Sequence, residues 1–520
     1  MSSAAYLQLC ERSREVYLLR SIAAVLSWDF ETYLPSKAVA YRADQLSYLE
    51  AKAHTLFTES CVGDWLQEAE QFGFERESEE GANIREWRRS FNRATKLPVA
   101  LVEEFERTRT IAREAWVQAR AEAKFSIFQS HLEKIVELTR QKADLWGYQE
   151  SPYDALIDDY EPGITAAELK PVLEELRVAL VELLGEIASN SVSESFLDGH
   201  YPIDGQQAFS AEVATAFGYD FTAGRVDTTM HPFATTLGPF DQRITTRYNT
   251  HRFEVSLYGV MHETGHALYE QGLRPDRTGL PVGDAVSLGI HESQSRLWEN
   301  HVGRTPQFWH LWHATASKHL PDVARFSPTD LANGVQRVAP SFIRVEADEV
   351  TYDLHILLRF EMELALIEGR LKVHDLPEAW NARFRELFGL VVPDDARGVL
   401  QDIHWSLGSL GYFPTYTLGN LNAAQLMFAA EKKVSGLSEQ LAKGNYVPLL
   451  DWLRENVHQH GRRYLPAELM RRATGEPTQA RYRIEYLRNK YLSLSKPLFG
   501  HRMAFPKLPL FISRQLTKPR

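Results

Sequence analysis

The sequence has few cysteines, no long hydrophobic run and no excess of basic residues. Only two cysteines, Cys10 and Cys61, occur in 520 residues, and they do not form a C-x-x-C pair. This scarcity excludes a disulfide framework and a thiolate zinc site, and it fits a reducing compartment. The formal net charge is -11, which argues against a general nucleic-acid binder because a phosphate backbone requires a basic surface.

Neither a signal peptide nor a membrane span is predicted. The first basic residue, Arg12, follows acidic Glu11, and the apolar stretch 18–28 is interrupted by Arg20. No uncharged apolar run reaches the roughly 20 residues that a bilayer requires. We therefore expect a cytoplasmic protein without a membrane or nucleic-acid partner.

The remaining composition, with 44% hydrophobic and 24% charged residues, is typical of a soluble globular protein. In long segments apolar residues return at steps of three and four positions, which predicts a mainly α fold. Helices are expected over 65–93, 102–146, 166–187, 254–272, 284–302, 349–369, 377–388, 421–442 and 466–488.

Two other regions differ from this helical pattern. Residues 226–233 and 242–248 favour β structure, and a turn-prone Thr236-Leu-Gly-Pro239 separates them. They predict a small antiparallel ribbon before the helix at 254–272. The last residues, 495–520, contain several basic residues and prolines but no acidic residue, which predicts a poorly packed, solvated tail.

The most informative stretch is His-Glu-x-x-His, at His262, Glu263 and His266. Two imidazoles four positions apart lie on one face of a helix, so both can reach a single cation. The glutamate beside the first histidine can then act on a water molecule held by that cation. The pattern favours a zinc-dependent hydrolase over a solvated helix face with two incidental histidines.

A catalytic zinc usually has three protein ligands, so a third must be found. One known completion, x-x-Gly-x-x-His, is excluded because Tyr269 and Gly272 occupy its glycine and histidine positions. The other common solution is a glutamate from a following helix, which the segment 284–302 supplies, with Asp284 as its N-cap. Periodicity alone does not decide between Glu292, Glu299 and His291 of that segment as the third ligand.

The chemistry of these parts is amide hydrolysis. Zinc lowers the pKa of a bound water towards about 7 and polarises a carbonyl oxygen. Glu263 would take the proton of that water and later pass it to the leaving amine. This chemistry does not by itself distinguish an endopeptidase from an exopeptidase.

Over roughly residues 6 to 491 the chain resembles the carboxypeptidase Taq family of metallocarboxypeptidases. Five motifs of that family occur in the same order: Asp241-Gln-Arg-Ile-Thr245, His262-Glu-Thr-Gly-His266, His291-Glu-Ser-Gln-Ser-Arg296, Ile343-Arg-Val-Glu-Ala-Asp348 and Gly398-Val-Leu-Gln-Asp-Ile-His-Trp405. The third motif selects Glu292 as the third metal ligand. One departure is that Ser36-Lys-Ala38 lacks a glycine that the family has after Trp28-Asp-Phe-Glu-Thr-Tyr-Leu-Pro35.

The resemblance implies a mostly helical, saddle-like fold with a deep central groove, a small sheet beside it, and a homodimer. It also implies release of single C-terminal residues from peptides with broad specificity, with Zn²⁺ or Co²⁺ as the metal. On this basis we expect one catalytic unit over 1–491, with a helical lobe over about 1–225 and a zinc-binding region over about 226–491. Residues 492–520 would be a basic C-terminal extension.

Further site residues follow from the need to recognise a free C-terminal carboxylate. A guanidinium matches the two oxygens of a carboxylate, and the motifs make Arg344 the first choice and Arg243 the second. The alternative is a structural ion pair, for Arg344 with Asp348 at i+4 if that segment is helical. His404 and Tyr412 are expected to stabilise the oxyanion of the tetrahedral intermediate, against the alternative that both are core residues.

Two rival functions remain. A helical zinc endopeptidase or dipeptidyl carboxypeptidase can have the same metal site. A metal-binding scaffold without turnover is disfavoured because such a protein has no chemical need for Glu263.

Overall fold

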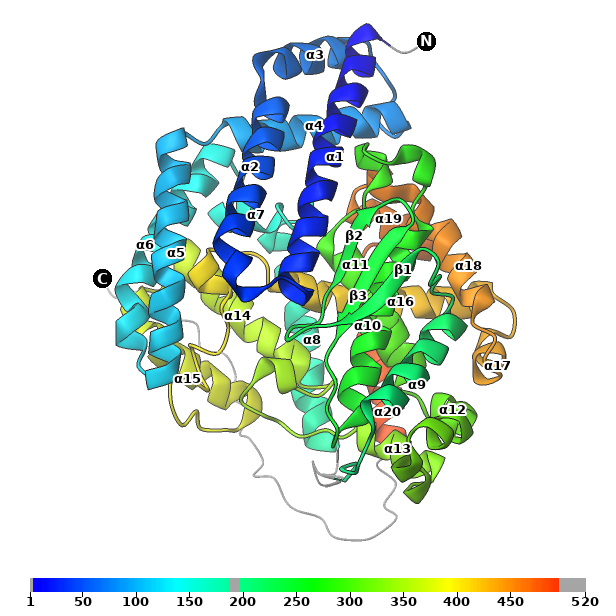
Figure 1. Ribbon diagram of the computed structural model, residues 1–520. Coiled ribbons are helices and arrows are strands. Elements are labelled where there is room, and N and C mark those ends of the chain that lie inside the picture. Colours follow the sequence, from blue (N-terminus) through cyan, green and yellow to red (C-terminus); the bar gives the residue numbers. More distant parts are fainter. Residues whose placement is uncertain (1–2, 188–195, 495–520) are drawn as a thin grey trace.

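The computed structural model describes residues 3–187 and 196–494 of the chain. Its regular structure is almost entirely helical, with one small sheet (Figure 1), so the mainly α prediction is confirmed. Among the described residues no helix is long and apolar enough to cross a membrane. The basic tail expected over 495–520 lies outside the described residues.

The first part of the chain consists of helices that pack in consecutive pairs. Helix α1 packs along α2, and α5 packs along α6, as Figure 1 shows. The helical pattern over 102–146 forms two helices rather than one, because Ala123 adopts a left-handed conformation with φ 52° and ends the first. The bounds are α1 Ala4–Thr32, α2 Val39–Thr58, α3 Ser60–Gln71, α4 Glu79–Thr95, α5 Val99–Glu122, α6 Phe125–Trp146, α7 Pro152–Ile157, α8 Ala166–Glu186 and α9 Ile203–Phe217.

The sheet has three strands, β1 Gly224–Thr228, β2 Ala234–Gly238 and β3 Asp241–Thr246, in the order β1-β3-β2. The prediction of an antiparallel ribbon was wrong in its pairing. The segment expected to be only a turn contains β2, which forms the hairpin with β3, so β1 lies on the other edge of β3 and runs parallel to it. The sheet is therefore mixed, and it leads directly into the helix that carries His262 and His266.

That helix, α10 Phe253–Gly272, is followed by α11 Leu288–Arg296 and a π-helix, Leu297–Gly303. Two later predictions were too long. The pattern over 421–442 is divided at Gly436, and the pattern over 466–488 is divided at Gly475, both at positive φ. The remaining helices are α12 Pro306–His319, α13 Pro328–Val335, α14 Tyr352–Ile367, α15 Leu376–Phe388, α16 Pro414–Lys433, α17 Leu437–Ala442, α18 Val447–Asn456, α19 Pro466–Thr474 and α20 Ala480–Leu494.

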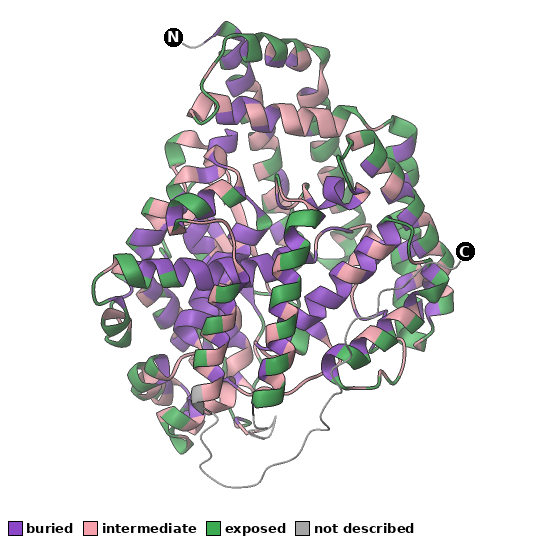
Figure 2. Ribbon diagram, turned by 180° about the vertical axis from the view of Figure 1, so that it is seen from behind, coloured by how far each residue is buried: buried purple, intermediate pink, exposed green. Residues whose placement is uncertain are grey.

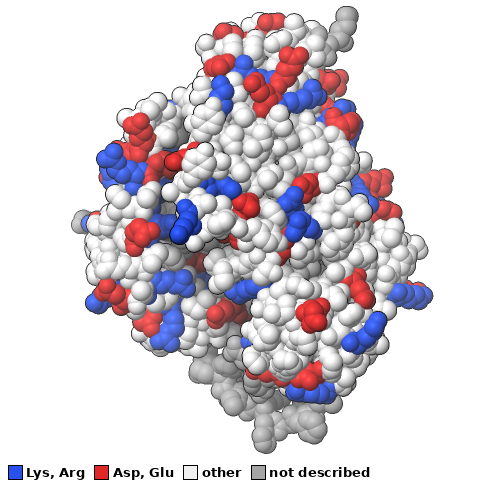
Figure 3. Space-filling view, in the orientation of Figure 1, with Lys and Arg blue, Asp and Glu red and all other residues white. Residues whose placement is uncertain are grey.

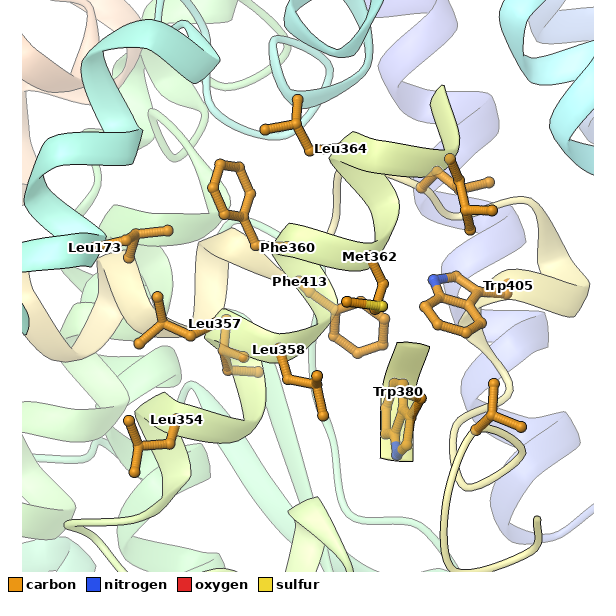
Figure 4. Packing of buried hydrophobic residues seen from close by; sticks show 14 of the residues in the cluster. Leu173, Leu354, Leu357, Leu358, Phe360, Met362, Leu364, Trp380, Trp405 and Phe413 are labelled. Atoms are coloured by element: carbon orange, nitrogen blue, oxygen red, sulfur yellow. The ribbon is translucent and has the colours of Figure 1, made fainter. Parts of the chain in front are cut away.

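Helix α14 is buried along nearly its whole length and forms the centre of the larger hydrophobic core. In Figure 4 its side chains pack against Leu173 of α8, Trp380 of α15, Trp405 and Phe413. A second core surrounds α10 and includes residues of α9, α12, α16 and α18. Figure 2 shows the burial of these central helices. Each core combines segments distant in sequence, and the division into two lobes near residue 225 stays a prediction.

A buried carboxylate on α14, Glu363, joins α7 to the segment between α15 and α16. The Glu363 carboxylate accepts hydrogen bonds from Trp405 Nε1 at 2.8 Å, Tyr153 Oη at 2.8 Å and the Gly411 amide at 3.0 Å. The bonds from Trp405 and Gly411 position the segment that carries His404 and Tyr412. On the surface, by contrast, acidic and basic side chains are interspersed over the face in Figure 3.

Candidate active site

Helices α10 and α11 approach each other closely where the two histidines lie. Gly265, between His262 and His266, faces the backbone of α11, and a Cβ there would lie 2.5 Å from the Gln294 carbonyl oxygen. No side chain larger than hydrogen fits at this position without moving α11. The glycine thus allows a carboxylate on α11 to reach both imidazoles.

Three ligand atoms converge at this contact. Glu292 Oε2 of α11 lies 3.5 Å from His262 Nε2 and 3.4 Å from His266 Nε2. The ligand atoms of these three residues all lie within 4.8 Å of one another. One cation bound to all three at about 2.0–2.2 Å fits this separation.

A carboxylate fixes the tautomer of His262. Its Nδ1 lies 3.0 Å from Glu299 Oε2. Although burial opposes ionisation, the Arg304 guanidinium lowers the pKa of Glu299 to about 2, so this carboxylate only accepts. His262 therefore donates through Nδ1, and Nε2, which faces Glu292, is the nitrogen that would bind a metal.

The tautomer of His266 is fixed by a histidine, His291, and a second carboxylate, Glu270. His291 donates through Nε2 to Glu270 Oε1 at 2.8 Å, so its Nδ1 is an acceptor. His266 Nδ1 lies 2.6 Å from that nitrogen and 3.1 Å from the His291 carbonyl oxygen. Burial also lowers the pKa of His266 to about 4, which keeps the ring neutral with its Nε2 lone pair free.

Glu292 is held as an ionised, oriented carboxylate. Burial alone would raise its pKa, but the Arg296 guanidinium and the two imidazoles keep that pKa well below its ordinary value. Arg296 Nε donates to Glu292 Oε1 at 2.7 Å and Ser295 Oγ donates to Oε2 at 3.0 Å. From the opposite side Gly419 of α16 packs so closely that a Cβ there would lie 2.4 Å from the Glu292 Cγ.

Glu263 is buried beside this centre without being one of the converging ligands. The residue is only 7% exposed, and burial raises the pKa of its carboxyl to about 7. Glu263 and His262 border a cavity of about 660 Å³. A second cavity of about 880 Å³ borders His291 and Glu270 on the α1 side of the centre.

The start of α11 differs from the sequence-based prediction. Ser287, not Asp284, is the N-cap, because its side chain accepts a hydrogen bond from the Ile290 amide. At its other end α11 continues into the π-helix that carries Glu299. Such wider turns are frequent at functional sites, and this one directs Glu299 at His262.

We expect Glu299→Gln to lower metal affinity or kcat/KM by about 10- to 100-fold, because it removes the charge that fixes the His262 ring. The measurement is metal competition with a chelator, together with kcat/KM. Glu212→Gln is the matched control, because Glu212 accepts from His319 Nε2 at 2.8 Å in an imidazole–carboxylate pair elsewhere. Equal effects of the two substitutions would contradict the assignment.

Arg344 is buried and paired, but not with Asp348. The helical segment at Arg344 is only Arg344–Glu346, so an i+4 contact does not form. Its guanidinium instead donates to Asp402 Oδ1 at 2.8 and 3.0 Å and to Tyr352 Oη at 3.0 Å. Asp348 accepts from backbone amides, including that of Ala339.

Arg243 lies on β3, where it forms two bonds of 2.8 and 2.9 Å with Asp241. Its guanidinium also lies 4.3 Å from the ring centroid of Trp28 on α1. Arg243 does not border either of the two cavities described above. Its described contacts are with Asp241 and Trp28, whereas Arg344 lies beside Tyr352 and Tyr416, so no described contact joins Arg243 to Arg344, His404 or Tyr412.

His404 and Tyr412 lie together on the Arg344 side of the centre. Their ring centroids are 5.3 Å apart, and Tyr416 Oη lies 3.5 Å from His404 Nε2. Burial lowers the pKa of His404 to about 4, so its imidazole is neutral and retains one N–H donor. Burial, and after it the nearby negative charge of Glu292, raises the pKa of Tyr412, so its hydroxyl also remains a donor.

Of the residues that orient the ligands, only His291 and Glu299 were expected near the metal from the sequence, and both were considered as ligands themselves. Arg296 had a usable signal, because it follows Glu292 by four positions on the same helix. Glu270 and Arg304 had no such signal, because their contacts depend on how α10 and the π-helix pack.

Comparison with known proteins agrees with this arrangement. Residues 8–491 match the family model described as carboxypeptidase Taq (M32) metallopeptidase. The chain is 43% identical over 504 residues to thermostable carboxypeptidase 1 of Thermus thermophilus, covering 94% of this chain and 99% of the relative. It is 37% identical over 475 residues to carboxypeptidase 1 of Bacillus subtilis, covering 91% and 95%.

Solved structures give the same result. The crystal structure of the M32 carboxypeptidase from Deinococcus radiodurans R1 superposes with a TM-score of 0.92 at 39% identity, covering 95% of this chain and 100% of that chain. Metallocarboxypeptidase 1 of Trypanosoma cruzi has a TM-score of 0.90 at 33% identity, covering 94% and 99%. Together with the converging histidines and glutamate, these matches show that the chain belongs to the carboxypeptidase Taq (M32) family of metallopeptidases.

Proposed function

We propose that this protein is a metallocarboxypeptidase that releases single residues from the free C-termini of peptides. The observation that carries the proposal is the convergence of two imidazoles and one carboxylate beside a buried, non-ligating glutamate at the border of a cavity. This is the donor set of a catalytic metal site that keeps one position for a water or substrate oxygen.

We propose Zn²⁺ as the metal, with Co²⁺ as an alternative, and His262, His266 and Glu292 as its ligands. Both Nε2 atoms face Glu292, whereas the Nδ1 atoms lie against Glu299 Oε2 and the His291 carbonyl oxygen. A set of two neutral imidazoles and one carboxylate suits zinc in a hydrolase. When bound, zinc would polarise the scissile carbonyl and lower the pKa of water.

The protein's own residues would then move the proton and hold the substrate. Glu263 would take a proton from the attacking water through its carboxylate and deliver it to the nitrogen of the leaving amino acid. The raised pKa of this buried carboxyl favours both steps. His404 and Tyr412 would donate hydrogen bonds to the oxyanion, a role supported by their neutral forms.

For the substrate carboxylate we propose Arg344 as the main binding residue and Arg243 as the second. Support for Arg344 comes from its position beside Tyr352 and Tyr416, near the oxyanion donors. Both guanidinium groups are paired within the fold, Arg344 with Asp402 and Arg243 with Asp241. Arg243 has less support, because the ring beside it is Trp28 of α1 rather than Tyr416.

We expect Arg344→Ala to raise KM for free-carboxylate peptides by about tenfold or more, because the substrate loses a charge-assisted hydrogen bond. Steady-state kinetics measure this change, and thermal unfolding checks that loss of the Asp402 contact leaves the protein folded. Arg397→Ala is the control, since Arg397 pairs with Asp394 on an exposed loop. An unchanged KM would show that another residue binds the carboxylate.

The proposed activity is tested by comparing one peptide with a free C-terminus and its amidated form. Product masses after incubation with the metal-loaded protein should show loss of one residue at a time from the free form only. Equal cleavage of the amidated form would favour the endopeptidase alternative, and release of dipeptides would favour a dipeptidyl carboxypeptidase. Binding of peptide without any product would support the scaffold.

We also propose a cytoplasmic location and a homodimer. Free cysteines at Cys10 and Cys61 support the former. The dimer rests on the family resemblance alone, and sedimentation of the purified protein at several concentrations tests it.

A further inference from the structure

The cavity beside Glu263 contains five arginines: Arg252, Arg296, Arg304, Arg337 and Arg483. Four of them have carboxylate partners within the fold. Arg252 pairs with Glu254, Arg296 with Glu292, Arg304 with Glu299 and Arg483 with Glu349. Their charges are thus largely neutralised by the protein itself.

Arg337 is different. Within the described residues its guanidinium forms no hydrogen bond, ion pair or contact with an aromatic ring. Its side chain is nevertheless half-buried at the cavity border rather than fully exposed to solvent. It is therefore a positive charge at the cavity border without an acceptor among the residues that the structure describes.

The backbone on both sides of Arg337 is fixed. On one side the Val335 carbonyl accepts from Arg304 Nη1 at 3.2 Å, and on the other the Ala339 amide donates to Asp348 Oδ2 at 3.1 Å. Arg304 in turn binds Glu299 at 3.0 Å. Hydrogen bonds thus run from the Val335 carbonyl, two residues before Arg337, through Arg304 and Glu299 to the proposed metal ligand His262.

We propose that Arg337 binds a carboxylate of the peptide substrate, an inference that rests on the proposed carboxypeptidase activity. A guanidinium presents paired N–H donors that match the two oxygens of a carboxylate. A fixed backbone lowers the entropic cost of using that donor pair. The carboxylate is either the C-terminus itself, which Arg337 would then bind in addition to Arg344, or an acidic side chain in the last residue.

Of the acidic residues that border this cavity, Glu346 is the exposed one, and its charge would repel a substrate carboxylate from either source. Among the described residues no ion pair joins it to Arg337. A substrate carboxylate next to Arg337 gains the attraction of the guanidinium, whereas water and ions screen the exposed Glu346 more strongly.

The test compares Arg337→Gln with wild type on two free-acid peptides that differ only in a terminal Glu or Gln. If Arg337 binds the terminal carboxylate, KM rises about tenfold for both peptides with kcat nearly unchanged. If it binds the side chain, KM rises by about this factor only for the Glu peptide. Arg247→Gln removes an exposed arginine outside the cavity and should change neither value.

Unchanged KM for both peptides, as in the Arg247→Gln control, would overturn the inference. Arg337→Lys serves as the conservative variant, and it should recover part of the lost affinity because the charge remains while the paired donors do not. Equilibrium binding of the same peptides in a Glu263→Gln background tests carboxylate binding by Arg337 separately from the proposed peptidase activity. If wild type releases no residue but Arg337→Gln still weakens binding, the activity is wrong and the Arg337 assignment holds.

Discussion

Glu263→Gln is expected to lower kcat by about 10²- to 10⁴-fold while the protein keeps its metal. The carboxamide has nearly the same shape as the carboxylate, so the buried site at the cavity border retains its packing. It cannot accept a proton from water, and Glu263 is not one of the three converging ligands. Metal analysis and single-turnover kinetics on the same preparation measure both effects.

Glu254→Gln is the matched control for this substitution. Glu254 lies on the same helix and borders the same cavity, but it pairs with Arg252. The kcat of the Glu254→Gln protein should stay near that of wild type. Loss of metal from the Glu263→Gln protein would show instead that Glu263 is a ligand and that the base lies elsewhere.

The second large effect is expected for Glu292→Ala, which should lose both metal and activity. The substitution removes the carboxylate that lies 3.5 and 3.4 Å from the two Nε2 atoms. Loss of groups that merely orient ligands costs about 10- to 100-fold, so loss of a ligand itself should cost more than about 100-fold in metal affinity. Metal content after dialysis, together with kcat/KM, gives the measurement.

Comparison with Glu299→Gln makes this prediction specific. Glu292→Ala should lower metal affinity more than Glu299→Gln does, because Glu299 contacts His262 at Nδ1 rather than at the metal-facing nitrogen. The reverse order of effects would make Glu299 the ligand, which is the alternative that periodicity alone left open. Circular dichroism of both variants separates metal loss from unfolding.

The helical part of this site followed from local rules. The spacing of His262 and His266 required a helix, and α10 spans Phe253–Gly272 against an expected 254–272. The third ligand did not follow from spacing, because Glu292 and Glu299 lie seven positions apart and thus on nearly the same face. The motif resemblance selected Glu292, and the structure brings that residue to both histidines.

The errors arose where a partner could not be identified from local propensity or spacing. β1 and β3 carry the residues that favour strands, but their direction depends on β2, which the sequence suggested only as a turn. Arg344 has an acidic residue at i+4, yet the packing of α14 brings Asp402 to it instead. The partner of a buried charge is a tertiary property, so local spacing predicts it poorly.

The most direct test of the account is a zinc titration of the metal-free protein while release of the C-terminal residue is followed. We predict that activity rises in proportion to bound zinc, reaches its maximum at about one ion per chain, and is absent from Glu292→Ala at the same zinc concentrations. Full activity in the metal-free protein, or equal activation of Glu292→Ala, would contradict a single catalytic metal held by His262, His266 and Glu292.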